Sequence, residues 1–119
     1  MRKIMRTASA IALAAIAIMS VSAATASAAT QGCSSGTVCL YPQNTGWNGG
    51  FPSDHWFRYG TVNLVNQFGT HRFFNNQTGG AGVYLCTGSN GTGTCSRLNA
   101  GSWRDYNFTP INSITLTPN

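Results

Sequence analysis

Four cysteines grouped in two close pairs restrict what this chain can fold into more than any other feature of its sequence. Cys33 lies six residues before Cys39, and Cys86 lies nine residues before Cys95. An even number of cysteines in a small exported chain indicates disulfide bridges, because thiols oxidise in such compartments. Four cysteines allow three connectivities, and neither their number nor their spacing selects one.

Residues 1–28 have the three parts of a secretory signal peptide. Three basic residues lie within the first six, an apolar run extends over 11–24, and Ala26-Ser27-Ala28 provides the small-residue pattern of a cleavage site. A membrane-spanning helix needs about 20 apolar residues, and this run is shorter. We therefore expect cleavage before Ala29, secretion to the extracellular space, and no membrane attachment once the signal is removed.

The mature region, residues 29–119, carries little charge. It contains four arginines, two aspartates, no lysine and no glutamate, which gives a net charge of +2, whereas the whole chain has +5. A nucleic-acid-binding surface requires a dense group of basic side chains that displaces counterions. Four scattered arginines do not provide one, so we expect no nucleic-acid partner. The 91 residues suffice for one small domain, which we expect to be monomeric.

Apolar residues alternate with other residues in two segments that contain cysteines. Val38 and Leu40 alternate in the segment 37–41, and Val83 and Leu85 do so in the segment 82–86. This period of two predicts half-buried strands. The same parity turns Cys39 and Cys86 away from the core, so we favour the local bridges Cys33–Cys39 and Cys86–Cys95 over a bridge through the centre.

Two landmarks recur at nearly the same offset and predict an internal repeat. Val38-x-Leu40 recurs as Val83-x-Leu85 after 45 residues, and Trp56-Phe57-Arg58-Tyr59 recurs as Trp103-Arg104-Asp105-Tyr106 after 47. The alternative is that Trp and Tyr recur by chance in a β-rich chain. Two copies would span residues 33–76 and 80–119, with closing strands near 70–74 and 112–116.

The spacing of turn residues predicts an all-β fold. Glycine and asparagine interrupt the chain every eight to twelve residues or so, and no segment after the signal keeps a helical period for three turns. Many short strands separated in this way form sandwiches or barrels. Two units of about four strands each fit a pair of Greek keys packed face to face.

Several motifs of the mature region resemble the secreted actinobacterial proteins grouped as peptidase inhibitor family thirty-six, typified by the streptomycete metalloproteinase inhibitor. The resemblance spans the mature chain and is carried by Cys33–Tyr41, Asn44–Gly50, Phe74–Gly79, Val83–Cys86 and Pro110–Ile114. It implies a βγ-crystallin-like sandwich, locally paired disulfides and a non-enzymatic inhibitor. It also implies a loop that offers a metallopeptidase an apolar side chain and a backbone carbonyl near the zinc.

Metal sites and enzyme chemistry have little support in this composition. Units of the βγ-crystallin fold often bind calcium, but the corresponding segments 67–72 and 108–113 lack the leading acidic residues, and Ca²⁺ takes 6 to 8 oxygen ligands. Asp54 and Asp105 are the only carboxylates of mature side chains, no nucleophile elbow accompanies them, and the two histidines lack a third zinc ligand. We expect no catalytic residue, no metal and no cofactor.

Two loops are candidate contact sites for a secreted peptidase. The first, Trp47, Asn48, Gly49, Gly50 and Phe51, contains two aromatic residues but no disulfide closes it. The alternative for these aromatics is that they cap one end of the sandwich. The second, Thr87, Gly88, Ser89 and Asn90, lies between Cys86 and Cys95 and has no apolar residue, and its neighbouring glycines predict flexibility.

A binding module for polysaccharide or the cell envelope is the alternative function. Aromatic side chains stack on sugar rings, and amides beside them bind hydroxyl groups. The candidates are Trp47, Phe51, Trp56, Phe57 and Trp103. Packing in the core is the structural alternative for all five. A secreted antimicrobial protein is a related possibility, for which a net charge of +2 is weak support.

Overall fold

The computed structural model describes residues 29–119, and the expected signal peptide lies outside the described residues. The chain between these limits forms short strands joined by turns and two 3₁₀ segments, η3 (Asn48–Gly50) and η4 (Ser89–Gly91). No helix of the described residues is long and apolar enough to cross a membrane. The strands are β1 (Ala29–Thr30), β2 (Cys33–Ser34), β3 (Thr37–Leu40), β4 (Asp54–Trp56), β5 (Gly60–Asn63), β6 (Thr70–Asn76), β7 (Gly82–Cys86), β8 (Cys95–Leu98), β9 (Trp103–Asn107) and β10 (Ser113–Thr117).

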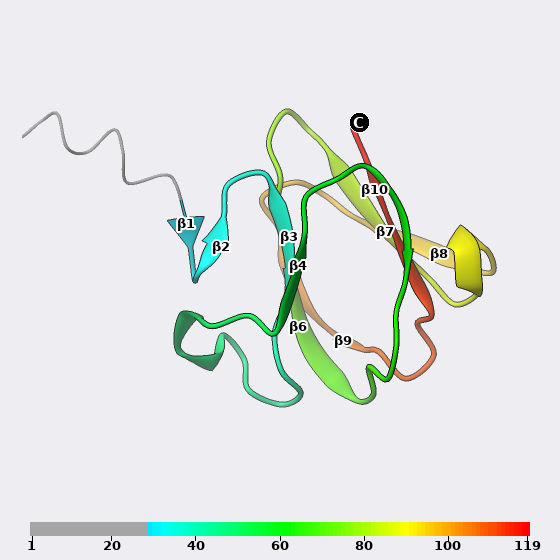
Figure 1. The fold of residues 1–119 in the computed structure, drawn as a ribbon, viewed down its shortest axis with the longest axis horizontal. Coiled ribbons are helices and arrows are strands. Elements are labelled where there is room, and N and C mark those ends of the chain that lie inside the picture. Colours follow the sequence, from blue (N-terminus) through cyan, green and yellow to red (C-terminus); the bar gives the residue numbers. More distant parts are fainter. Residues whose placement is uncertain (1–28) are drawn as a thin grey trace, which may run out of the picture.

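Two antiparallel four-stranded sheets make up the body of the protein (Figure 1). The first sheet has the order β4-β3-β6-β9, and the second has the order β5-β10-β7-β8. A separate hairpin of β1 and β2 lies at one side of the first sheet. The predicted all-β sandwich is confirmed.

The two units exchange one strand each. β3 to β6 belong to the first half of the chain, yet β5 lies in the second sheet; β7 to β10 belong to the second half, yet β9 lies in the first sheet. Each sheet is therefore completed by the third strand of the other unit. This interlocking buries both units against one another in a single core.

The apolar alternation predicts the central strands well. β7 has the predicted bounds, β3 ends one residue earlier than expected, and the closing strands cover 70–76 and 113–117. Within these strands Leu40 pairs with Phe73, and Leu85 pairs with Ile114. The first landmark of the repeat thus occupies equivalent places in the two sheets.

The second landmark of the repeat does not align in space. Trp56 lies in β4, the second strand of its unit, where it pairs with Val38. Trp103 lies in β9, the third strand of the other unit, where it pairs with Phe74. The prediction that these tryptophans are equivalent is wrong. The connections after β3 and β7 differ in length, so residues at a constant offset in the sequence do not lie on equivalent strands.

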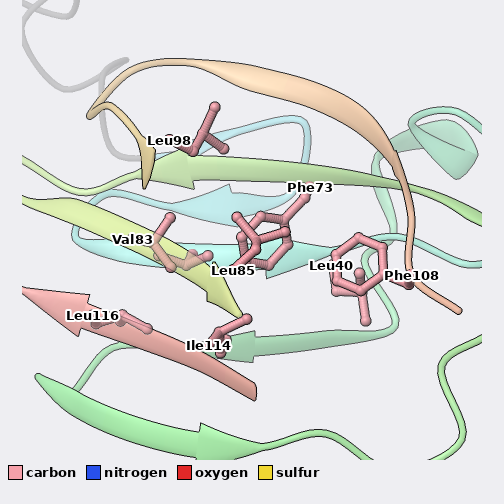
Figure 2. Packing of buried hydrophobic residues seen from close by; sticks show 9 residues of the cluster. Leu40, Phe73, Val83, Leu85, Leu98, Phe108, Ile114 and Leu116 are labelled. Atoms are coloured by element: carbon pink, nitrogen blue, oxygen red, sulfur yellow. The ribbon is translucent and has the colours of Figure 1, made fainter. Parts of the chain in front are cut away.

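The core lies between the two sheets (Figure 2). β3 and β6 contribute Val38, Leu40 and Phe73 from one side. The second sheet contributes an aliphatic set from the other side, with Phe108 at the edge: Val83, Leu85, Leu98, Ile114 and Leu116. All are nearly inaccessible to solvent, so this layer supplies most of the hydrophobic stabilisation.

A second, smaller cluster covers the outer face of the first sheet. It consists of Cys33, Cys39, Tyr41 and Phe74, with Trp47 packed against it. Cys39 points away from the main core, as the strand parity predicts, yet only 1% of its surface is exposed because the hairpin and the loop after β3 cover it. Cys86 is equally buried, whereas Cys95 is exposed. Outward parity therefore turns Cys39 toward a second buried cluster and not toward solvent, and Cys95 is the one exposed cysteine of the four.

Candidate functional site

Both local disulfides are present. Cys33 is bonded to Cys39, and Cys86 to Cys95, and the described residues include no free cysteine. The connectivity favoured by strand parity is confirmed. Two disulfides place the protein in an oxidising environment.

The first candidate loop, Trp47–Phe51, is a compact turn rather than a flexible connection. The Gly50 amide donates to the Trp47 carbonyl at 2.9 Å, and the Phe51 amide donates to the Asn48 carbonyl at 3.2 Å. The Asn48 side chain also donates to the Phe51 carbonyl at 3.0 Å. Asn48, Gly49 and Gly50 have consecutive positive φ angles of 50°, 67° and 89°, which explains why two glycines follow an asparagine.

The two aromatic residues of this loop have different roles. Trp47 makes T-shaped contacts with Tyr41, Phe74 and Trp103, at centroid distances of 5.2, 5.5 and 5.1 Å. It therefore anchors the loop to the outer cluster on the face of the first sheet. Phe51 is 71% exposed and projects from the other end of the same turn. Neither residue caps an end of the sandwich, which was the structural alternative for the two aromatics.

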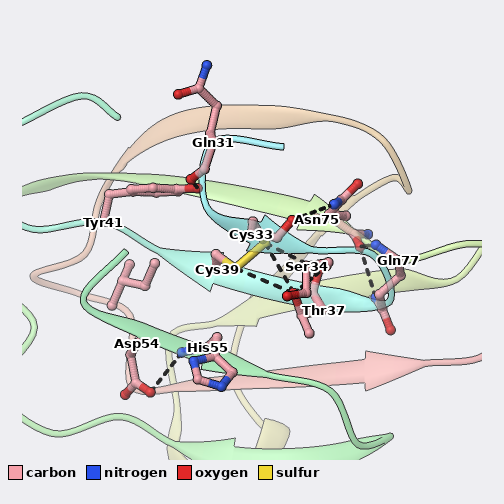
Figure 3. Close-up of a disulfide and its surroundings, with 12 residues drawn as sticks. Gln31, Cys33, Ser34, Thr37, Cys39, Tyr41, Asp54, His55, Asn75 and Gln77 are labelled. Atoms are coloured by element: carbon pink, nitrogen blue, oxygen red, sulfur yellow. Dashed lines mark hydrogen bonds between the residues drawn. A yellow bond between two sulfur atoms is a disulfide. The ribbon is translucent and has the colours of Figure 1, made fainter. Parts of the chain in front are cut away.

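The first disulfide stabilises this loop from outside it. The β1–β2 hairpin passes so close to the loop that a Cβ added at Gly32 would collide with the carbonyl oxygen of Gly50. The hairpin is fixed by the Cys33–Cys39 bridge and by the buried Tyr41 hydroxyl, which donates to the Gln31 carbonyl at 2.7 Å (Figure 3). A loop without its own disulfide is thus supported by a hairpin that has one. The sequence offered no sign of this contact except a glycine before Cys33.

An arginine and an aspartate hold the aromatic side of the loop. The Arg72 guanidinium lies 4.0 Å from the ring centroid of Trp103 and 4.9 Å from that of Trp47. It donates from Nε and Nη2 to the two carboxylate oxygens of Asp105, both at 2.9 Å. These hydrogen bonds hold the pKa of Asp105 below its usual value, and the same pair raises the pKa of Arg72. Sequence reasoning did not identify Arg72, because its partners are distant in the chain.

The second candidate loop is also well ordered by its hydrogen bonds. Asn90 and Asn63 bond reciprocally, at 2.7 Å from the Asn90 amide and 2.9 Å from the Asn63 side chain. The Ser113 hydroxyl donates to the Gly88 carbonyl at 2.6 Å and accepts from the Gly91 amide at 2.9 Å. The glycines allow close approach of the backbone, since a Cβ at Gly88 would collide with Thr92. The loop Thr87–Asn90 is held by these bonds but offers no apolar side chain.

The ionisable residues do not converge. Asp54 and Asp105 lie on β4 and β9, the opposite edges of the first sheet, which places their strands about 14 Å apart. Asp54 accepts from the His55 amide at 2.8 Å. His71 is buried, with Nδ1 2.7 Å from the Tyr41 carbonyl and Nε2 2.9 Å from the Phe68 carbonyl. Within residues 29–119 no three His, Cys, Asp or Glu side chains are grouped around a common point.

Comparison with known proteins adds no relative. A scan against protein-family models finds no match, and searches of curated proteins and of solved structures find none.

Proposed function

We propose that this protein is a secreted, monomeric, non-enzymatic peptidase inhibitor that acts through the loop Trp47–Phe51. The observation that carries the proposal is the exposure of Phe51 at the end of a turn whose other end is anchored by Trp47. An exposed large apolar side chain on a rigid support suits the specificity pocket of a peptidase. The resemblance to peptidase inhibitor family thirty-six supports the same function.

Rigidity is what distinguishes an inhibitor loop from a substrate. A flexible peptide loses conformational freedom when it binds, whereas a preformed loop avoids most of that cost. Here the ordering is supplied by the outer cluster, the hairpin contact at Gly32 and the Arg72–Asp105 pair. The target proposed is a secreted peptidase with an apolar specificity pocket, thermolysin-like metallopeptidases first.

The backbone around Phe51 also disfavours turnover. Phe51 itself is extended, with φ −120° and ψ 96°, but Asn48, Gly49 and Gly50 before it have positive φ angles. The next residue, Pro52, has no amide hydrogen to donate to a peptidase. A peptidase that accepts the Phe51 side chain therefore binds one extended residue. The backbone on both sides of this residue differs from the extended backbone of a substrate.

The proposal is tested with the oxidised mature protein and a panel of thermolysin-like and apolar-specific serine peptidases. At micromolar excess we expect inhibition of at least one of them. Phe51→Ala removes the apolar contact and should weaken inhibition by roughly 30-fold, equivalent to about 2 kcal/mol of buried apolar surface. Phe57→Ala, which truncates another exposed phenylalanine, is the matched control and should inhibit like the unmodified protein. Full activity of every peptidase in the panel would refute the proposal.

The tryptophans suggested for sugar stacking are arranged differently from a sugar-binding platform. Trp47 and Trp103 are inclined at 66°, and Arg72 lies over the Trp103 ring. Trp56 packs against the main core. Because the rings are not coplanar, binding of polysaccharide through these tryptophans is disfavoured, and a saccharide site must be sought elsewhere on the protein.

A further inference from the structure

A pocket lies between two connections from different halves of the chain. It has a volume of about 280 Å³ and is lined by residues 64–68, which follow β5, and by Thr109, Ile111 and Asn112, which precede β10. Neither candidate contact loop contributes to it. Sequence reasoning assigned no role to the residues of this pocket except a lost calcium motif.

The walls of the pocket are fixed by hydrogen bonds between the two connections. The Leu64 amide donates to the Asn112 carbonyl at 2.9 Å, and the Phe108 amide donates to the Gly69 carbonyl at 2.8 Å. The Gly69 amide donates to the Thr109 hydroxyl oxygen at 2.9 Å. His71 holds the inner side through the Phe68 carbonyl. The pocket is therefore a built feature of the junction between the two units rather than a gap between mobile loops.

The lining is neutral and carries several amide groups. No Asp, Glu, Lys, Arg or His of the described residues lines it. Asn112 uses its side-chain nitrogen to donate to the Thr87 carbonyl at 2.8 Å, which leaves its side-chain oxygen as an acceptor. The Asn66 side chain makes no hydrogen bond with the described residues, and Asn66 has a positive φ of 54°. Asparagine is one of the few non-glycine residues that adopt this conformation readily.

Apolar side chains complete the pocket. Phe68 is 56% exposed and Val65 is 71% exposed, so an aromatic ring and a branched aliphatic group stand at the surface. Leu64 and Ile111 are half-buried, pack against the main core and line the pocket. The pocket thus combines an accessible aromatic face, apolar residues, the side-chain amide of Asn66 and the side-chain oxygen of Asn112.

We propose that this pocket binds one neutral N-acetylated sugar ring. Its volume lies just below the lower end of small-molecule pockets, about 300 Å³, which suits a single ring rather than a longer ligand. The apolar face of a pyranose stacks on an aromatic ring such as Phe68, and the amides of Asn66 and Asn112 bond to hydroxyl and acetamido groups. Leu64 and Ile111 provide apolar contact for the acetamido methyl group.

None of the described residues that line the pocket is charged. This favours a neutral ligand over a charged one. A charged group entering a neutral pocket loses hydration without gaining a partner of opposite charge. Chitin and peptidoglycan both contain N-acetylated sugar rings. Either polymer could therefore supply the ligand. The site is independent of peptidase inhibition, because it shares no residue with the loop Trp47–Phe51.

The test is a titration of the isotopically labelled, oxidised mature protein with chitotriose, followed by amide NMR spectra. We expect shift changes confined to residues 64–68 and 109–112 and to the side-chain amides of Asn66 and Asn112, with a dissociation constant on the order of 1 mM. Phe68→Ala should weaken binding at least about tenfold by removing the stacking surface. Asn66→Gly keeps the positive φ, removes the amide and should also weaken binding.

The controls keep the outcome decisive. Tyr59→Ala truncates an exposed aromatic residue outside the pocket and should bind chitotriose unchanged. Dispersed amide spectra establish that each variant is folded. If Phe68→Ala does not fold, Asn66→Gly serves as the test variant in its place. Missing shift changes, changes located elsewhere, or equally strong binding of cellotriose would overturn the proposal. Retention on insoluble chitin or on peptidoglycan, lost in Phe68→Ala, would support it and identify the source.

Discussion

Tyr41 couples the stability of the protein to alkaline pH. The residue is fully buried, and burial raises its pKa to about 12, from an ordinary value of about 10. Between these values the unfolded chain has released the phenol proton while the folded chain retains it, so the free energy of unfolding falls as pH rises from about 10 to about 12. Below about pH 10 this residue causes no pH dependence. The full effect is about 2–3 kcal/mol.

Urea denaturation at several pH values tests this coupling. Tyr41→Phe loses the hydrogen bond to Gln31, so we expect a loss of about 1 kcal/mol at pH 7. The alkaline fall should become much smaller in this variant, with the remainder coming from Tyr106, whose pKa burial also raises. Tyr59→Phe, an exposed counterpart, should leave both values unchanged. An equally steep alkaline fall in Tyr41→Phe would show that another group causes it.

Gly32 provides a second test at the scale of one residue. Gly32 and Gly36 both have positive φ, 73° and 89°, but a Cβ at Gly36 meets nothing within 4 Å whereas one at Gly32 collides with Gly50. Gly36→Ala should therefore cost about 1 kcal/mol for the backbone conformation alone. Gly32→Ala should cost at least about 1 kcal/mol more and increase amide exchange in residues 47–51. Equal losses for the two variants would mean that the hairpin does not support the loop.

At the scale of elements, strand parity is the best guide that the sequence contains. It correctly predicts the central strands and the local pairing of the cysteines. It does not predict what covers the outer face of the first sheet, because Tyr41, Trp47 and Phe74 are brought together by the path of the loop after β3. A period of two assigns a residue to a face, but the neighbours on that face depend on packing.

The two disulfides should contribute similarly to the stability of the protein but differently to peptidase inhibition. They close loops with sequence separations of 6 and 9, and a chain-entropy model gives about 2–3 kcal/mol for each. We expect losses of that size for the double variants C33A/C39A and C86A/C95A in chemical denaturation. Only C33A/C39A should also weaken peptidase inhibition, because its disulfide holds the hairpin beside Gly50. If C86A/C95A alone abolished inhibition, the contact loop would be Thr87–Asn90 instead.

At the scale of the whole molecule, one buried asparagine joins the two units. Asn75 is fully buried in β6; its side chain donates to the carbonyls of Ala81 and Leu98, both at 3.0 Å, and accepts from Gln77. Leu116 has the equivalent place in the second sheet, since it pairs with Val83 as Asn75 pairs with Val38. The two units thus differ at the position where they meet.

Replacing this asparagine should destabilise the entire domain. Asn75→Leu leaves two buried carbonyls and the Gln77 donors without partners, for a loss of roughly 3 kcal/mol or more in the free energy of unfolding. Asn76→Leu, next to it in β6, removes one bond to the Cys33 carbonyl and should cost about 1 kcal/mol. Denaturation followed by fluorescence and by circular dichroism should show one common transition. Two separate transitions would contradict a single core shared by the units.

The sequence by itself determined the fold class, the positions of the central strands and the two local disulfides. Periodicity, turn residues and strand parity are local properties, and short-range geometry is enough to interpret them. The tertiary structure decided which residues support the exposed Phe51, how β5 and β9 exchange sheets, and where a neutral pocket forms. Those features depend on contacts between residues far apart in the chain, such as Gly32 with Gly50 and Arg72 with Asp105. Such contacts arise from close packing of side chains and backbone, which no local pattern encodes.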